Sequence, residues 1–205
     1  MTRPLTIRSL TMAALAGLLL VPSMAAATPF EVDPVHSSIT FKIRHLVSKV
    51  EGRFTDWNGT LDFDAENPEA STAEAVIQTA SITTGNDRRD NHLKSADFFE
   101  VETYPQITFK STKVEKAGDG FTLTGDFTMH GVTKPVTLDV EFLGVGDHPM
   151  GKGATVAGFT ATGTIDRKDW GITWNKTFDS GGTLLSDTVE MVIEVEAVHT
   201  EEPSE

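Results

Sequence analysis

The sequence offers few residues in the patterns that metal binding or catalysis requires. Six histidines occur among 205 residues, but none forms a His-x-x-x-His or His-Glu-x-x-His pair. The absence of cysteine also excludes thiolate ligands, cysteine nucleophiles and disulfide bonds. We predict no metal and no cofactor, while three histidines from distant segments could still converge in the fold. The histidines are His36, His45, His92, His130, His148 and His199.

Motifs for acyl, nucleotide and glycoside chemistry are absent as well. The sequence has no Gly-x-Ser-x-Gly elbow and no phosphate-binding glycine loop, and 180–182 fits an ordinary loop better. Asp62 and Asp64 are two residues apart, as are Glu194 and Glu196, which favours the wet face of a strand over a glycosidase pair. We therefore predict that the protein is not an enzyme.

The composition describes an acidic, globular chain. The sequence carries 17 Lys and Arg against 30 Asp and Glu, and 39% of its residues are hydrophobic. That apolar content is too high for a disordered chain, and the length suits one domain. The negative charge would repel both a nucleic-acid backbone and an anionic membrane surface, so we expect no nucleic-acid partner and no anionic membrane as the main partner.

The first 27 residues have the pattern of a cleaved secretory signal. Arg3 and Arg8 precede an uncharged apolar run at 10–21, and small residues lead to a cleavage site after Ala27. The run has about 12 residues, whereas a membrane-spanning helix needs ~20. A buried N-terminal helix is the alternative. We predict a mature protein outside the cytoplasm, in the periplasm of a bacterium, without stable membrane insertion.

Beyond residue 28 the dominant pattern is alternation of apolar and polar residues. Such strands have one apolar and one wet face, which is typical of antiparallel sheets. Alternation is clear at 39–43, 121–129, 136–142, 159–165 and 189–197, and further strands are predicted at 50–64, 73–82 and 106–116. Residues 86–99 break the pattern and predict a short helix and loop, 144–153 a flexible glycine-rich loop, and 201–205 an acidic tail.

One-faced strands must bury their apolar faces, either in a two-sheet sandwich or in a closed barrel. About eight strands close into a barrel that holds side chains or one small ligand. Small residues on the inward parity could leave room for a ligand, or they could relieve strand bending. These residues are Ser111, Gly125, Ala157, Ala161 and Gly163. The pattern alone leaves both interpretations, and the sandwich, open.

An ordered series of motifs covers nearly all of the chain after residue 28. The segments of this series are 33–37, 44–46, 52–54, 81–86, 89–99, 104–109, 130–136, 166–171 and 187–189. By these segments the sequence closely resembles the YceI-like family of periplasmic, lipocalin-like proteins described as polyisoprenoid-binding.

The resemblance implies an all-β fold over residues 28–200: an extended eight-stranded antiparallel, lipocalin-like barrel with a short capping helix. It also implies an apolar channel for one long-chain amphiphile. Members of the family are linked to isoprenoid quinones, polyprenyl phosphates or fatty amides.

Residues of the inward parity and of the helix are the candidates for lining such a channel. For the tail they are Phe41, Ile43, Phe54, Leu93, Phe98, Phe99, Phe109, Phe127, Phe142, Phe159 and Ile165. For an anionic head group they are Arg44, His45, Arg89, His92 and Lys94. Each tail candidate could equally be ordinary core. Arg89 with Asp90 could instead form an ion pair that fixes the helix, and Arg167 could pair with Asp166 or Asp169.

The leading hypothesis is therefore periplasmic binding, sequestration or transport of a hydrophobic small molecule. The alternatives are a metal- or histidine-assisted hydrolase of lipid head groups, tested at His36 and His92, and a filled barrel with a structural or stress role. A homodimer formed by edge-strand pairing is compatible with this architecture.

Overall fold

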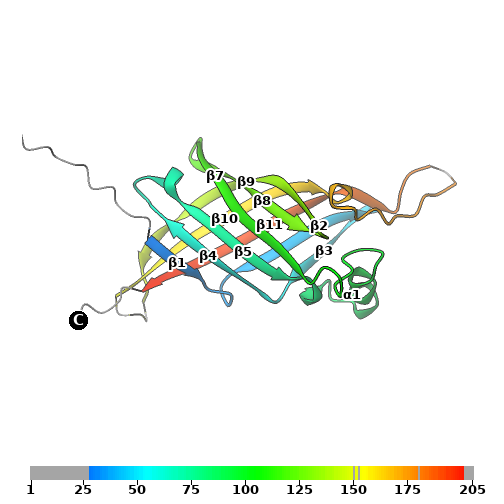
Figure 1. Cartoon of the computed structure of the whole chain (residues 1–205), viewed down its shortest axis with the longest axis horizontal. Helices are drawn as coiled ribbons and strands as arrows, with labels where there is room; N and C mark the ends of the chain where they lie inside the picture. The colour runs from blue at the N-terminus through cyan, green and yellow to red at the C-terminus, as the bar shows by residue number, and fades with distance from the viewer. Residues whose placement is uncertain (1–27, 150, 152, 180, 201–205) are drawn as a thin grey trace, which may run out of the picture.

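The alternating segments form one antiparallel sheet that closes on itself (Figure 1). The structure, a computed structural model, describes residues 28–149, 151, 153–179 and 181–200. The signal predicted at 1–27 and the tail predicted at 201–205 lie outside the described residues. The strands are β1 (Thr28–Val32), β2 (Ser38–His45), β3 (Ser48–Phe54), β4 (Trp57–Phe63), β5 (Thr72–Gln78), β6 (Ile82–Thr83), β7 (Gln106–Ala117), β8 (Gly120–Met129), β9 (Val132–Asp147), β10 (Ala154–Asp166) and β11 (Leu185–Thr200). The helices are α1 (Asp87–Lys94) and the short 3₁₀ segments η1 (Pro68–Ala70), η2 (Thr79–Ser81) and η3 (Arg167–Trp170).

These eleven strands occupy eight positions around a closed barrel, and we call each position a stave. The hydrogen-bonded order is β1-β4-β5-β7-β8-β9-β10-β11-β2-β3-β6, with β1 also pairing with β11. Three staves consist of two consecutive strands each, namely β1 with β2, β3 with β4, and β5 with β6. The two strands of each pair are hydrogen-bonded along the same neighbouring stave: β1 and β2 both pair with β11, β4 and β3 pair with β1 and β2, and β5 and β6 pair with β4 and β3. The sheet is thus a closed, eight-stranded antiparallel barrel with one α-helix, and the predicted fold class is confirmed.

The break between β1 and β2 is bridged by side-chain and backbone hydrogen bonds. The backbone N–H of Asp33 donates to the carbonyl of Glu196 at 2.8 Å. The Ser37 hydroxyl donates to that same carbonyl and accepts from the backbone N–H of Glu196. These contacts replace ladder bonds, so the barrel stays closed where the chain leaves the sheet.

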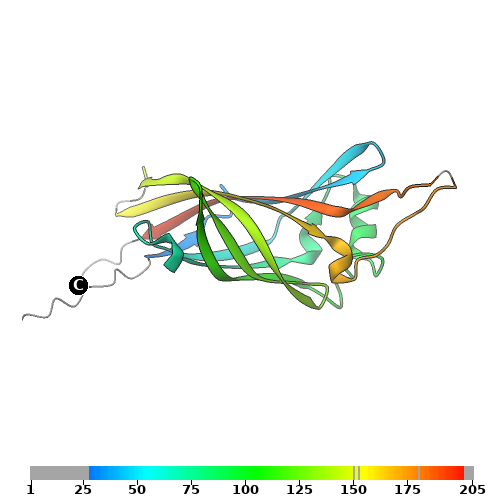
Figure 2. The same cartoon turned by 90° about the horizontal axis from the view of Figure 1, so that it is seen from above.

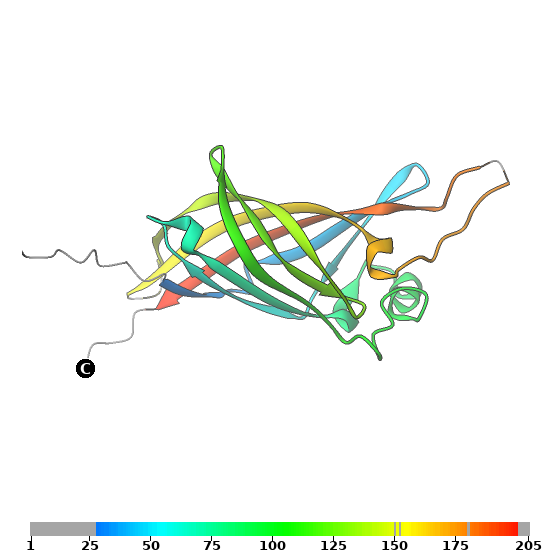
Figure 3. The ribbon, with the colours of Figure 1, turned by 45° about the horizontal axis from the view of Figure 1, so that its top comes forward.

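The barrel is elongated, and its two ends differ (Figures 2 and 3). We call the end that carries α1 the helix end. It also holds the β2–β3 turn and the segment 171–184, which extends beyond the strands. We call the opposite end, where β1 begins and β11 finishes, the far end. It also holds η1 and the β9–β10 connection.

The predicted helix and loop at 86–99 contain α1. Asn86 caps this helix by accepting a hydrogen bond from the backbone N–H of Arg89.

The glycine-rich segment at 144–153 was predicted to be a loop throughout, and this is wrong for its first part. Residues 144–147 belong to β9, where Val145 pairs with Ala157 and Asp147 with Thr155. Cross-strand pairing there outweighs the low strand propensity of glycine. Among the described residues, no helix is both long and apolar enough to span a bilayer.

The inward glycines make room for neighbouring side chains rather than for a ligand directly. A Cβ at Gly125 would lie 2.4 Å from Cζ of Phe109, its neighbour across the β7–β8 pair, and one at Gly163 would lie 2.6 Å from Cδ2 of Leu138. Of the two interpretations left open by the sequence, free space for a ligand is therefore not supported at Gly125 and Gly163. Because the Phe109 ring folds over Gly125, it lies along the barrel wall.

Candidate ligand-binding cavity

A cavity of about 740 Å³ lies inside the barrel. Its wall consists mainly of aliphatic and aromatic side chains contributed by all eight staves and by α1. That volume falls within the range of roughly 300–1,000 Å³ that small-molecule sites occupy. The inward parity predicted from the alternation is correct here, because Ile39, Phe41 and Ile43 all line the cavity. The barrel is hollow.

Ten of the eleven predicted tail contacts line this cavity. They are Phe41, Ile43, Phe54, Leu93, Phe98, Phe99, Phe109, Phe127, Phe159 and Ile165. Phe142 does not, because its ring packs between Phe63 and Phe159 with centroid distances of 5.1 and 5.3 Å. Contact of these residues with a ligand stays a prediction.

Phe142 belongs to a cluster of packed aromatic rings in the part of the barrel toward the far end. Phe30, Phe63, Ala157, Phe159 and Ala197 are its buried members, with exposed fractions of 0–8%. Phe63 and Phe159 meet edge to face with centroids 5.0 Å apart, and both also line the cavity. This cluster, which we call the phenylalanine plug, therefore forms part of the cavity wall on that side.

The predicted head-group residues divide into two groups. His45, Arg89 and His92 line the cavity at the helix end. Arg44 and Lys94 do not: the guanidinium of Arg44 donates to the carbonyl of Leu46 at 2.9 Å, and Lys94 faces a small polar depression beside Asp90 on the outside. The prediction of Arg44 and Lys94 at the site is not supported by their placement.

Arg89 is held by the segment that precedes the helix. Its Nε donates to the hydroxyl of Thr84 at 2.7 Å and its Nη2 to the Thr84 carbonyl at 3.0 Å. The neighbouring Asp90 accepts hydrogen bonds from Thr83 and Thr84. Burial disfavours the charge of Asp90, but these hydrogen bonds outweigh it and lower its pKa. Hydrogen bonds to β6 and Thr84, rather than the Arg89–Asp90 ion pair considered from the sequence, thus fix α1.

His92 lies where the helix meets the segment 171–184. Its Nε2 is 2.8 Å from Oδ2 of Asp97, and its ring stands edge to face against Phe98 and Trp174, with centroids 5.0 and 4.9 Å away. All of these rings line the cavity. His92 is therefore a packed wall residue with one nitrogen already hydrogen-bonded.

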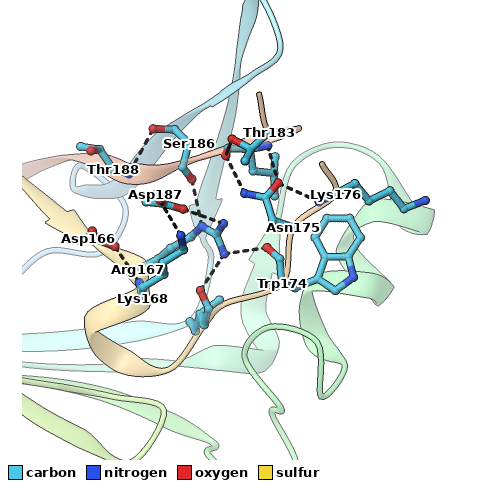
Figure 4. A network of polar contacts seen from close by, with 12 residues as sticks. Asp166, Arg167, Lys168, Trp174, Asn175, Lys176, Thr183, Ser186, Asp187 and Thr188 are labelled. Carbon is cyan, nitrogen blue, oxygen red and sulfur yellow. Dashed lines mark hydrogen bonds and ion pairs between the residues drawn. The ribbon is translucent and has the colours of Figure 1, made fainter. Parts of the chain in front are cut away.

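Arg167 anchors the segment 171–184 (Figure 4). Its side chain is 4% exposed and donates to the carbonyls of Ile172, Trp174 and Ser186 at 2.7–3.0 Å. Its ion-pair partner is Asp187 at 3.3 Å, so the predicted pairing with Asp166 or Asp169 is wrong. Burial lowers the pKa of the guanidinium, while the charges of Asp187 and Asp166 oppose that shift.

Sequence reasoning missed several residues of the wall. Arg88 lines the cavity beside Arg89, and Trp57 and Trp174 add two indole rings. Trp57 shares the parity of Leu61 and Phe63 within the strand predicted at 50–64, so alternation could have identified it. Trp174 lies outside any strand or helix, so alternation carried no signal for it. Arg88 could have been identified from the sequence, because it precedes the head-group candidate Arg89 in the segment predicted to be helical.

The carboxylates of Asp62 and Asp64 lie in different environments. Asp62 is exposed, as predicted, but Asp64 is buried and accepts from the backbone N–H groups of Glu66 and Asn67. The prediction of a solvent-facing Asp64 is therefore wrong, because the chain turns away from the strand at Phe63.

Among the described residues one cluster has the composition of a metal site. Ligand atoms of Asp33, His36 and Glu196 lie within 4.8 Å of one another at the break between β1 and β2. However, Nδ1 of His36 lies 2.6 Å from the Asp33 carboxylate, and this hydrogen bond raises the pKa of His36 and lowers that of Asp33. The nitrogen that faces both carboxylates is thus engaged in an ion pair. His36 is outside the cavity wall and largely exposed.

The family model described as a YceI-like domain matches residues 30–197. A UPF0312 protein of Pectobacterium atrosepticum is 43% identical over 195 residues, which cover 95% of each chain. The crystal structure of the Campylobacter jejuni YCEI protein superposes with a TM-score of 0.67 at 37% identity, over 77% of this chain and 90% of that one. A polyisoprenoid binding domain from Saccharophagus degradans superposes with a TM-score of 0.55 at 17% identity, over 84% and 98% of the two chains, and so shares the fold.

Proposed function

Since the chain belongs to the YceI-like family, we propose that it binds the tail of one long-chain amphiphile in the barrel cavity. The observation that carries this proposal is the apolar cavity of about 740 Å³. Each buried methylene contributes ~0.8 kcal/mol, so ten of them gain about 8 kcal/mol, and the entropy costs of association offset part of this gain. The ligand class comprises isoprenoids, isoprenoid quinones, polyprenyl phosphates and fatty amides. The description of the Saccharophagus degradans domain as polyisoprenoid binding supports an isoprenoid.

The polar head is expected at the helix end, where Arg88, Arg89, His45 and His92 lie on the cavity wall. Guanidinium groups form strong, charge-assisted hydrogen bonds with phosphate. An isoprenyl monophosphate should therefore bind more tightly than the corresponding alcohol, and Arg88→Gln with Arg89→Gln should remove the difference. Equal affinities for both compounds in the wild type would reject this assignment of the head group.

The role that follows is sequestration or transport in the periplasm, without chemical conversion of the ligand. The apolar wall supports a binding protein, because tail burial needs little specific chemistry. The signal pattern in the first 27 residues supports export.

Titration with an isoprenoid quinone tests tail binding directly. Trp57 and Trp174 line the cavity, whereas Trp170 is buried outside it, so a bound quinone should quench part of the tryptophan fluorescence. Ala161 lines the cavity and Thr162, its neighbour on β10, is exposed. Ala161→Phe should weaken binding at least tenfold, while Thr162→Phe leaves it unchanged. Saturable quenching that is the same in both variants would show that the quinone binds elsewhere.

A further inference from the structure

Three large apolar side chains are exposed at the tips of the helix end. Leu46 and Phe178 are 43% and 41% exposed, and Val47 is fully exposed. Leu46 and Val47 form the β2–β3 turn, and Phe178 lies in the segment 171–184. Both elements project beyond the strands at this end (Figures 1 and 2). They are also joined, because the backbone N–H of Leu46 donates to the carbonyl of Leu184 at 3.0 Å.

The β2–β3 turn holds its apolar residues in a costly conformation. Leu46 has a φ of 53°, a left-handed conformation that residues other than glycine, asparagine and aspartate rarely adopt. The hydrogen bond from Arg44 to the Leu46 carbonyl and the bond to Leu184 maintain it. A glycine or asparagine would fit the same backbone with less strain, so the exposed leucine makes this turn less stable than either of those residues would.

Charge is distributed unevenly between the two halves of the barrel. We divide the barrel across its strands and assign 38–58, 76–111, 124–137 and 159–193 to the half nearer the helix end. This half carries 12 Lys and Arg against 13 Asp and Glu, a formal charge of −1. The described residues of the other half carry 2 Lys against 14 Asp and Glu, a formal charge of −12; it comprises 28–37, 59–75, 112–123, 138–158 and 194–200. Because the Debye length is about 8 Å at physiological salt, an approaching surface interacts only with the charges nearest to it.

The far half also exposes apolar side chains, so the two halves differ in formal charge rather than in whether they expose apolar residues. Leu143 and Val145 on β9 are 59% and 52% exposed. They lie in the acidic half, which an anionic surface would repel. The helix end combines exposed apolar tips with near-neutrality, and it is also where the cavity wall carries Arg88 and Arg89.

We propose that the helix end docks on a lipid bilayer through Leu46, Val47 and Phe178, and that the amphiphile passes between bilayer and cavity at this end. The inference rests on the proposed function, since a long-chain amphiphile resides in bilayers when it is not bound to protein. Apolar tips that enter the headgroup region, with little opposing charge, give reversible interfacial binding.

Flotation with vesicles of phosphatidylethanolamine and phosphatidylglycerol at a 3:1 ratio tests docking without reference to any ligand. The variant combines Leu46→Ser, Val47→Ser and Phe178→Ser, and the matched control combines Leu143→Ser with Val145→Ser. Wild type and control should float with the vesicles, and the triple variant should lose at least 80% of the floating fraction. Failure of the wild type to float, or equal loss in the control, would overturn docking.

Two further measurements separate docking from the proposed function. Uptake of isoprenoid quinone diluted from ethanol should be the same in wild type and triple variant, while the rate of uptake from quinone-loaded vesicles should fall at least tenfold in the variant. Equal vesicle rates would contradict docking. Absence of uptake by either route, with flotation intact, would reject the proposed function and leave docking supported. Circular dichroism of both variants checks that the barrel is folded.

Discussion

The two ends of the barrel are held together by different kinds of contact. At the far end the ring centroids of neighbouring phenylalanines in the plug lie 5.0–6.5 Å apart, and Ala157 and Ala197 are almost completely buried. At the helix end, hydrogen bonds made by Arg167, Arg89 and Asp90 hold a long segment and a short helix in place. Apolar packing is non-directional and excludes water, whereas directed polar contacts fix the position of charged groups.

This difference assigns separate roles to the two ends. The far end contributes mainly to the stability of the barrel, because its rings bury large areas and only Phe63 and Phe159 of the plug phenylalanines reach the cavity. The helix end positions cationic residues on the cavity wall and exposes apolar tips. Mutations at the far end should therefore change stability with little effect on binding of the head group.

The largest expected loss of stability comes from the far end. Phe30→Ala removes a ring that is 5% exposed, contacts Phe63 and does not line the cavity, so the free energy of unfolding should fall by about 3–5 kcal/mol. Phe178→Ala, at the exposed tip of the helix end, should change it by less than about 0.5 kcal/mol. Urea denaturation of both variants makes the comparison. Similar losses in the two would show that the ends do not differ in this way.

Removal of the Arg167 side chain should lower the free energy of unfolding slightly less than Phe30→Ala does. Arg167→Met leaves the carbonyls of Ile172, Trp174 and Ser186 without their donor, and about 1 kcal/mol for each gives a loss of about 3 kcal/mol. Lys168→Met removes an exposed ion pair to the same Asp187 and should cost less than about 1 kcal/mol. Denaturation curves and hydrogen exchange of 171–184 report the two effects. If Lys168→Met were the more damaging change, the anchor would be misassigned.

The attachment of the helix is expected to be weaker and dependent on pH. Asp90→Asn removes the charge that Thr83 and Thr84 stabilise and should cost about 1–2 kcal/mol, seen as faster hydrogen exchange in α1. Because the pKa of Asp90 is lowered by folding, its stabilisation is present above the unfolded value near 3.9 and disappears as pH falls through the folded pKa. The variant should therefore match the wild type in strong acid. A constant difference between them at every pH would contradict this origin.

The smallest effect concerns the break between β1 and β2. Folding raises the pKa of His36, so its contribution is present at low pH and is lost as pH rises through that value. The pKa of Asp33 is lowered, so its contribution is lost as pH falls. The ion pair therefore acts from below about pH 4 to above about pH 6.5. His36→Ala should lower the melting temperature slightly inside this window and leave it unchanged at pH 9. His199→Ala serves as a control on the neighbouring strand.

Alternation was sufficient to predict antiparallel strands and most of the residues that line the cavity, because a sheet with one apolar face directs every second side chain to the buried side. It placed Phe41, Phe127 and Ile165 correctly for this reason. It did not distinguish a barrel from a sandwich, and the barrel was expected from the resemblance to the YceI-like family. Alternation failed at Phe142, which has the inward parity but lies in the phenylalanine plug. Parity gives the direction of a side chain but not its height along the barrel.

The contacts of charged residues could not be predicted from sequence spacing. Arg167 was expected to pair with a neighbour in sequence, but it reaches Asp187 and three carbonyls because the chain returns to it through 171–184. Lys94 was grouped with Arg89 because both lie in one motif, yet the helix places them on different faces. The sequence also left open whether Gly125 provides free space, because it does not show the Phe109 ring across the β7–β8 pair.

The most direct test of the central claim is the lipid content of the protein purified from its native host without detergent. Organic extraction followed by mass spectrometry should recover close to one long-chain amphiphile for each wild-type chain. Ala161→Phe should carry at least tenfold less, and Thr162→Phe should carry the wild-type amount. Wild-type protein that is empty after extraction and also fails to take up added isoprenoids would contradict the account.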